Sequence, residues 1–278
     1  MMEEIRCRDC KYVMLQNRGI DIDSIFPYLR DGNGDKTMLN VSPNHGRSYV
    51  VGESKDNRYV VSKGNGLSYS LYNFINTHEI GDETLGLLLK KDALRDFNMG
   101  LEVESLGIKT NRMECVIELE DTLTLPTGNK IHPVLLQYNV ECPYRISDAT
   151  FMEKEDIEMY IGRWNSSRYE TKYLIAAEKL IRNLRILHDH EILHNAYTTH
   201  NITWSLELLD FELACSRKMP YDKEEERRHV KDLFSREIIG TCYMVKYIAG
   251  VLKEKMDNTL VENIYKDYGF NLSDYKVD

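Results

Sequence analysis

The sequence has an excess of negative over positive charge. Its 36 Lys and Arg residues are outnumbered by 45 Asp and Glu residues, which gives a formal net charge of -9. A chain with this balance does not as a whole attract nucleic acid or an anionic membrane surface, so we expect neither as a partner. Any phosphate group that the protein holds must therefore be bound by a local basic cluster.

Long apolar runs are missing as well. Residues 1–9 are acidic and basic by turns, so we expect no cleavable signal sequence there. The most apolar helical segment, near the C-terminus, is interrupted by Lys246 and is too short for a membrane span. With 42% hydrophobic and 29% charged residues, the composition is that of an ordinary globular protein, and we expect a soluble, cytoplasmic one.

Paired cysteines are scarce, since only Cys7 and Cys10 form a C-x-x-C pair among the six cysteines. A structural zinc site needs about four ligands, and no second pair supplies them. We therefore expect two reduced thiols on a turn rather than a zinc or redox site, and no disulfide framework.

The order of the predicted elements indicates an α+β fold. Strands are predicted at 48–52, 58–62, 113–118 and 134–138, with a hairpin turn at 54–57 and a helix at 87–105 that ends near Gly107. Helices follow at 172–188 and 230–256, and a charged loop lies at 216–228. We expect a protein-kinase-like, two-lobed fold, with a strand-rich lobe over 1–142 and a helical lobe over 143–278.

The segment from His194 to Asp210, which reads HNAYTTHNITWSLELLD, carries the strongest functional signal. It offers the amide of Asn201 and then the carboxylate of Asp210 after a predicted short strand, Leu206–Leu209. Amide and carboxylate oxygens are ligands that suit Mg²⁺, and kinase-like enzymes place an Asn ahead of an Asp in this order. We predict that Asn201 and Asp210 bind the metal.

A second group of residues precedes this segment. Lys63 ends a predicted strand and is followed by Gly64 and Gly66, which permit a phosphate to approach the backbone closely. Asp96, on the predicted helix, is placed to pair with Lys63, as a helix acid pairs with the strand lysine in protein kinases.

These residues lie in six short motifs that together resemble the selenoprotein O-like pseudokinases over residues 46–210. The matching segments are Gly46-Arg47 with Val50-Val51-Gly52-Glu53, Lys63-Gly64-Asn65-Gly66, Arg95-Asp96-Phe97 with Leu106–Arg112, Pro143-Tyr144-Arg145 running on to Phe151, His194–Asn201, and Asp210-Phe211.

The resemblance implies a kinase-like fold and AMPylation, the transfer of AMP from ATP to hydroxyl side chains, with the nucleotide inverted relative to ordinary kinases. It implies ATP and Mg²⁺ or Mn²⁺ as cofactors. It places Lys63, Arg112 and Arg145 at the nucleotide together with Gly64 and Gly66. Arginine suits phosphate because its planar fork bonds two oxygens at once.

The chain also departs from the family pattern at catalytic positions. His200 replaces the Asp that precedes the metal-binding Asn, Asp96 replaces a longer Glu, and Glu212 stands in place of a Gly. Ala196 occupies the position of the ordinary kinase's catalytic Asp. His200 either serves as a base, since imidazoles titrate near neutral pH, or replaces the lost carboxylate and weakens metal binding. The shorter Asp96 needs close packing or a bridging water to reach Lys63.

Three functions remain open from the sequence. The first is an ATP-dependent nucleotidyltransferase that acts on Ser, Thr or Tyr of an unidentified protein. The second is a degenerate pseudokinase that acts as a nucleotide-binding or interaction module. The third is an ordinary phosphotransferase, which Ala196 disfavours.

Overall fold

The computed structural model describes residues 2–5, 12–19, 28–31, 48–64, 88–120, 122–124, 130–164, 166–216 and 224–275. Its contacts divide the chain into two compact units, Met1–Leu101 with Asn111–Pro143 and Glu102–Thr110 with Tyr144–Asp278. Gly66, Cys7 and Cys10 fall outside the described residues, so the predictions made for them stay predictions.

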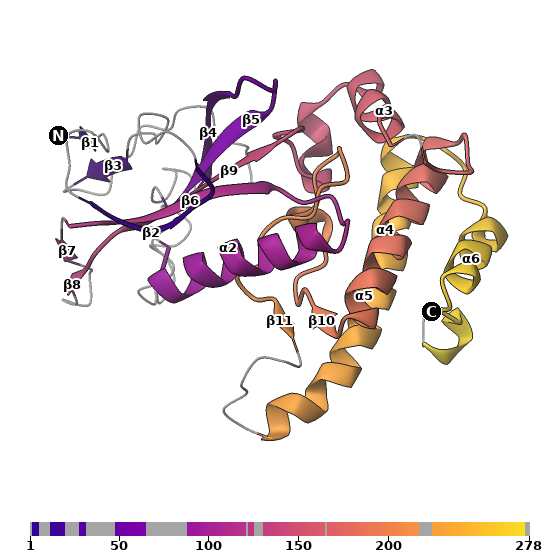
Figure 1. Cartoon of the computed structure of the whole chain (residues 1–278). Helices are drawn as coiled ribbons and strands as arrows, with labels where there is room; N and C mark the ends of the chain where they lie inside the picture. The colour runs from indigo at the N-terminus through magenta and orange to yellow at the C-terminus, as the bar shows by residue number, and fades with distance from the viewer. Residues whose placement is uncertain are drawn as a thin grey trace, which may run out of the picture. The chain divides into compact units, whose positions relative to one another are not determined.

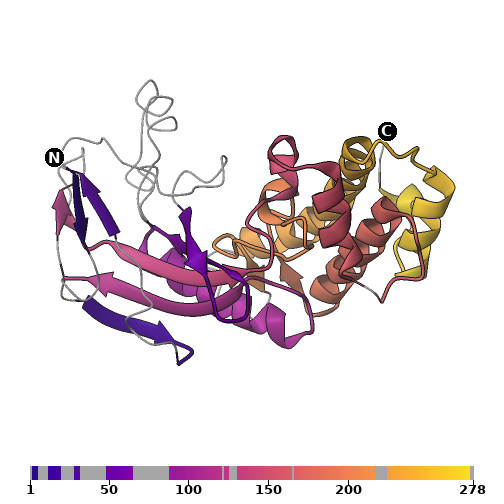
Figure 2. The same ribbon diagram turned by 90° about the horizontal axis from the view of Figure 1, so that it is seen from above.

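The first unit is built on a five-stranded antiparallel sheet with the order β2-β6-β9-β5-β4 (Figures 1 and 2). Its strands are β2 (Tyr12–Asn17), β4 (Ser48–Glu53), β5 (Tyr59–Lys63), β6 (Arg112–Leu119) and β9 (Val134–Val140). Two small pairs, β1 (Met2–Ile5) with β3 (Tyr28–Asp31) and β7 (Leu123–Thr124) with β8 (Lys130–Ile131), complete the unit's strands as described. Every residue of β9 is buried, which agrees with its central place in the sheet.

Helix α2 (Lys90–Ser105) runs along the sheet of the first unit (Figure 1). Ala93 and Phe97 are buried on its inner face, at the helical spacing predicted from the sequence. The helix ends as expected: the amide of Gly107 donates to the Glu104 carbonyl, and Gly107 adopts a φ of 77°, which glycine reaches without a steric penalty.

The second unit is helical. Its helices are α3 (Lys154–Gly162), α4 (Lys172–Asp189), α5 (Glu224–Val251) and α6 (Asn258–Asp267), with short 3₁₀ turns η4 (Ile146–Phe151), η5 (Thr199–Asn201) and η6 (Leu272–Asp274). Helices α4 and α5 lie side by side (Figure 1), and the predicted inward leucines of α4, such as Leu184 and Leu187, are buried. The two-residue strands β10 (Ile192–Leu193) and β11 (Cys215–Ser216) pair at one end of the segment that carries the candidate metal ligands.

The α+β fold class is confirmed by this arrangement, in which an antiparallel sheet with one helix precedes a helical unit. Three finer predictions are wrong. The charged loop predicted at 216–228 is helical from Glu224, where α5 begins. Leu206–Leu209 is not a strand: Leu206 has a φ of 60° and closes a turn on Thr203, and Leu208 forms only isolated bridges to Ile202 and Thr110. The last helix predicted to run to 256 ends at Val251, because Lys253 takes a left-handed φ of 56°.

Helix α4 also buries a lysine, which leads to a prediction about stability. Lys179 is 5% exposed and its ammonium lies 5.2 Å from the centre of the Trp164 ring. Burial, followed by the nearby charges of Arg182 and Lys109, lowers the pKa of Lys179 from 10.5 to about 8. The folded protein therefore binds this proton less tightly than the unfolded chain does, which costs stability whenever the lysine is protonated in both states.

We expect Lys179→Met to raise the free energy of unfolding at pH 7, by up to about 3 kcal/mol. The gain should be complete below pH 8, should shrink as the pH rises through 8 to 10.5, and should be absent above 10.5, where the amine is neutral in both states. Urea denaturation of both proteins at several pH values measures this. A gain that does not change with pH would show that packing of the methionine, and not charge, is responsible.

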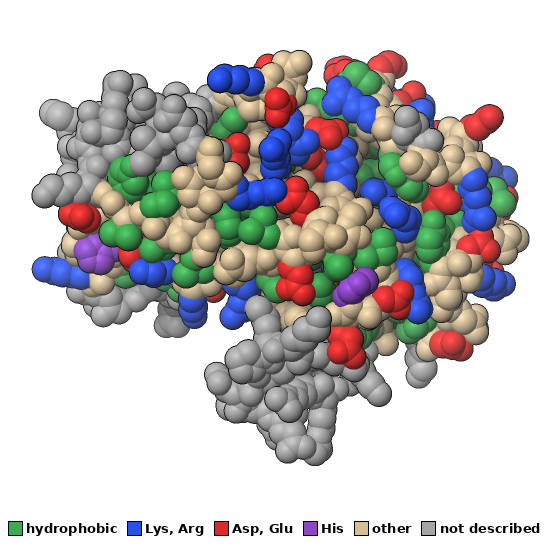
Figure 3. All heavy atoms as spheres, viewed as in Figure 1, with side chains coloured by type: hydrophobic (Ala, Val, Ile, Leu, Met, Phe, Trp, Pro, Cys, Tyr) green, Lys and Arg blue, Asp and Glu red, His purple; other side chains and the backbone are tan. Residues whose placement is uncertain are grey.

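Acidic and basic side chains are interspersed over the face drawn in Figure 3. No helix within the described part of the chain combines the length and the apolar character that crossing a bilayer requires.

Candidate active site

Lys63 and Asp96 form a direct ion pair in the first unit. Lys63 ends β5, Asp96 lies on α2, and the Lys63 Nζ donates to the Asp96 Oδ2 at 2.7 Å. The side chains are 4% and 0% exposed, so the pair is withdrawn from water. No bridging water is needed for the shorter acid, because the ammonium and the carboxylate are already in direct contact.

Gly64 fits its position because the backbone leaves no room for a side chain. Its φ is 97°, and a Cβ placed there would lie 2.2 Å from the Val134 carbonyl oxygen. A glycine directly after Lys63 therefore lets β5 end tightly against β9, which fixes the point at which the lysine side chain leaves the sheet.

In the second unit, a chain of hydrogen bonds organises the segment from His194 to Asp210. The amide of Ala196 donates to the His194 Nδ1 at 3.3 Å, so the ring carries its proton on Nε2, which donates to the Leu209 carbonyl at 2.8 Å. Burial lowers the pKa of His194, which favours this neutral form. The His194 ring thus fixes the position of Leu209, the residue before Asp210.

Asn201 is fixed from the same loop. Its Nδ2 donates to the Ala196 carbonyl at 3.0 Å, and its own carbonyl accepts from the Leu209 amide at 2.8 Å. Asn201 as a whole residue is 8% exposed. Its Oδ1 lies 3.5 Å from the Nη1 of Arg145, at the limit of a hydrogen bond. The structure therefore brings Arg145 and Asn201 together, with Arg145 bridged to Thr203 by its backbone.

The turn between Asn201 and Asp210 is closed by a buried carboxylate. Glu207, which is 0% exposed, accepts from the Ser205 hydroxyl at 2.6 Å, and its amide donates to the Thr203 Oγ1 at 3.2 Å. The Lys109 Nζ donates to the Ser205 carbonyl at 3.1 Å. These bonds return the chain so that Asn201 lies next to Leu209, the residue before Asp210.

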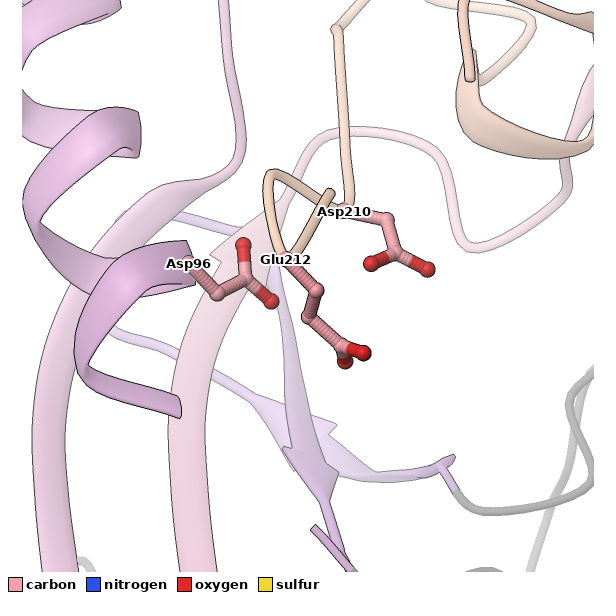
Figure 4. Close-up of side chains that lie close together, drawn as sticks. All are labelled: Asp96, Asp210 and Glu212. Carbon is pink, nitrogen blue, oxygen red and sulfur yellow. The ribbon is translucent and has the colours of Figure 1, made fainter. Parts of the chain in front are cut away.

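Asp210 and Glu212 supply two carboxylates from one loop. Asp210 has a φ of 62°, and one oxygen of each carboxylate lies within 4.8 Å of the other. Figure 4 draws both side chains leaving this loop, and it also labels Asp96 on α2. The donors that the second unit offers, two carboxylates and the Asn201 amide oxygen, are hard oxygen ligands and fit Mg²⁺ or Mn²⁺ better than a softer ion.

The remaining predicted residues have more open surroundings. His200 is exposed on η5, and its amide lies 3.4 Å from the Thr198 Oγ1. Arg112 begins β6 in the first unit, where its exposed guanidinium lies 3.4 Å from the Asp56 carboxylate. Ala196 offers only a methyl group in place of an acid.

Sequence reasoning treated Glu212 as a departure and did not identify Glu237 at all. For Glu212 the sequence does contain a signal, namely its spacing of two residues from Asp210. When the chain turns between them, two acids at this spacing direct their carboxylates into one region. For Glu237 no local signal exists, because it acts on a loop 42 residues away.

Comparison with known proteins gives distant likenesses only. No protein-family profile matches the chain, and no curated protein matches it. Among solved structures, a Stt7 homologue from Micromonas algae soaked with ATP is similar over 86% of this chain and 80% of its own, with 12% identity and a TM-score of 0.43. WaaP in complex with acyl carrier protein is similar over 85% of this chain and 89% of its own, with 10% identity and a TM-score of 0.35.

Proposed function

We propose that the protein binds ATP with a divalent cation and transfers AMP to a hydroxyl group of a protein. The observation that carries the proposal is the buried Lys63–Asp96 pair, which has the same residue types on the same kinds of element as the strand-lysine to helix-acid pair that kinase-like enzymes use at the nucleotide. A buried ammonium that a carboxylate holds in place is a fixed positive charge, and such a charge suits phosphate oxygens.

Each residue has a role in this proposal. Lys63 and Arg145 bind phosphate oxygens, with Arg112 as a further candidate, and Asp96 orients Lys63. Asn201 and Asp210, joined by Glu212, hold Mg²⁺ or Mn²⁺, which when bound neutralises phosphate charge.

In the reaction, the acceptor hydroxyl oxygen forms a bond to the α-phosphorus of ATP. The bond from that phosphorus to the bridging oxygen breaks, and pyrophosphate leaves with the electron pair. The hydroxyl proton passes to a base, for which the exposed imidazole of His200 is our candidate. Nucleotidyl rather than phosphoryl transfer is supported by the motif resemblance to selenoprotein O-like pseudokinases and by Ala196, which removes the ordinary kinase's acid.

Incubation with protein substrates and Mg²⁺ or Mn²⁺, using ATP labelled at either the α- or the γ-phosphate, tests the proposal. We expect protein-bound label only from the α position. Label only from the γ position would identify a phosphotransferase instead. If no label is transferred but ATP still raises the melting temperature, the protein is a degenerate nucleotide-binding module. The replacement of the family's Asp by His200 favours this alternative.

A further inference from the structure

A buried carboxylate on α5 holds the loop that carries the candidate metal ligands. The Glu237 Oε1 accepts from the amide of Asn195 at 2.8 Å. Asn195 directly follows His194 and adopts a φ of 64°, a conformation that Asn tolerates better than most residues. This bond fixes the backbone where the chain turns from β10 into the loop.

The second oxygen of the same carboxylate is held from helix α4. The Glu237 Oε2 lies 2.9 Å from the His188 Nε2, and the two side chains are 6% and 9% exposed. The His188 ring packs against Phe234, one helical turn before Glu237, with ring centres 4.2 Å apart. Both carboxylate oxygens are therefore engaged, so the side chain has one orientation.

From Asn195 the bonds continue to both candidate metal ligands. His194, the preceding residue, holds the Leu209 carbonyl next to Asp210. Ala196, the following residue, accepts from the Asn201 amide group and so sets which way the Asn201 oxygen points. A shift of the Asn195 backbone would thus be passed to Asn201 and Asp210 together.

We infer that Glu237, supported by His188, is a positioning residue for the divalent cation site. The inference rests on the proposed ATP and metal binding. Glu237 touches neither nucleotide nor metal; it acts through the Asn195 backbone. Partners that orient metal ligands are often as necessary as the ligands themselves.

Three variants and one control test this inference. Glu237→Leu removes both bonds, and Glu237→Gln keeps an amide oxygen for the Asn195 N–H. His188→Phe keeps a ring against Phe234 but removes the bond to Oε2. Glu262→Gln is the matched control, because it neutralises an exposed carboxylate on α6 of the same unit.

We expect Glu237→Leu to weaken Mn²⁺ binding in the presence of ATP by at least about tenfold, measured by electron paramagnetic resonance of free Mn²⁺. Binding of ATP without metal should not change, because Lys63 and Arg145 remain. Glu237→Gln should keep most of the Mn²⁺ affinity, His188→Phe should lose part of it, and Glu262→Gln should lose none. A merely structural role would instead lower both affinities together, and that result overturns the inference.

Hydrogen exchange gives a second readout that does not need nucleotide. In Glu237→Leu, or in His188→Phe if the leucine variant does not fold, we expect faster amide exchange over 194–201 and unchanged exchange in α6. If the loop exchanges as in the parent, Glu237 does not position it. If the loop loosens while the parent itself binds no ATP, the proposed function fails but the positioning by Glu237 stands.

Discussion

Replacing Asp96 by alanine is expected to lower the free energy of unfolding by about 3–5 kcal/mol, because it removes the carboxylate in contact with a buried ammonium. Lys63 is 3% exposed, so water cannot easily take the place of that carboxylate. The same variant is expected to lose ATP binding, because the ammonium is no longer held in one position. Chemical denaturation and thermal shift with ATP measure the two effects.

A double variant separates folding from binding. Lys63→Met with Asp96→Leu replaces the pair by apolar side chains, and exchanges of this kind in protein interiors are often neutral or even stabilising. We therefore expect the double variant to recover most of the lost stability while ATP binding stays absent.

An exposed pair in the same unit is the control. Lys90 and Glu118 are in contact at 2.7 Å, but their side chains are 49% and 21% exposed. Breaking that pair with Glu118→Gln should cost no more than about 1 kcal/mol.

If the Lys63–Asp96 double variant bound ATP as the parent does, Lys63 would have no part in nucleotide binding.

The parts of the fold that the sequence predicts are those with local causes. The β4–β5 hairpin follows from two β-branched runs around a polar turn, and the end of α2 follows from Gly107. Helix α4 follows from apolar residues at helical spacing. Each of these signals lies within a short window of residues.

The parts that the sequence does not predict depend on distant partners. Strand β2 is one such case, because its pairing with β6 joins residues about a hundred positions apart and its own residues alternate only weakly. The apolar run Leu206–Leu209 has the composition of a strand, yet the bond from the Ser205 hydroxyl to the Glu207 carboxylate and the turn from Thr203 to Leu206 give it another conformation.

The candidate site divides in the same way. The identities of Lys63, Asp96, Asn201 and Asp210 are visible as motifs. The bonds that support them, made by Glu237 and by the His194 ring, are seen only in the folded structure, because these two bonds to main-chain groups leave no pattern in the sequence.

Asp210→Asn is expected to remove metal-dependent ATP binding while leaving the fold intact. Asp210 has a left-handed φ of 62°, and Asn is among the few residues that adopt this conformation readily. The variant therefore removes the charge of the carboxylate without adding backbone strain, which Asp210→Ala would add.

With ATP and Mg²⁺ at about a hundred times the dissociation constant, ligand binding stabilises a protein by about 2.7 kcal/mol, and this increment is what Asp210→Asn should lose. The melting temperature without ligand should stay close to that of the parent. Titration of Mg²⁺ at fixed ATP, followed by thermal shift, measures both quantities.

Glu212→Gln decides which carboxylate holds the ion. Glu212 is 8% exposed and lies close to Asp210, so its charge also attracts a cation. If Asp210 is the ligand and Glu212 assists, Glu212→Gln should weaken Mg²⁺ dependence less than Asp210→Asn does. The reverse order would assign the ion to Glu212, and unchanged Mg²⁺ dependence in both variants would place the cation elsewhere.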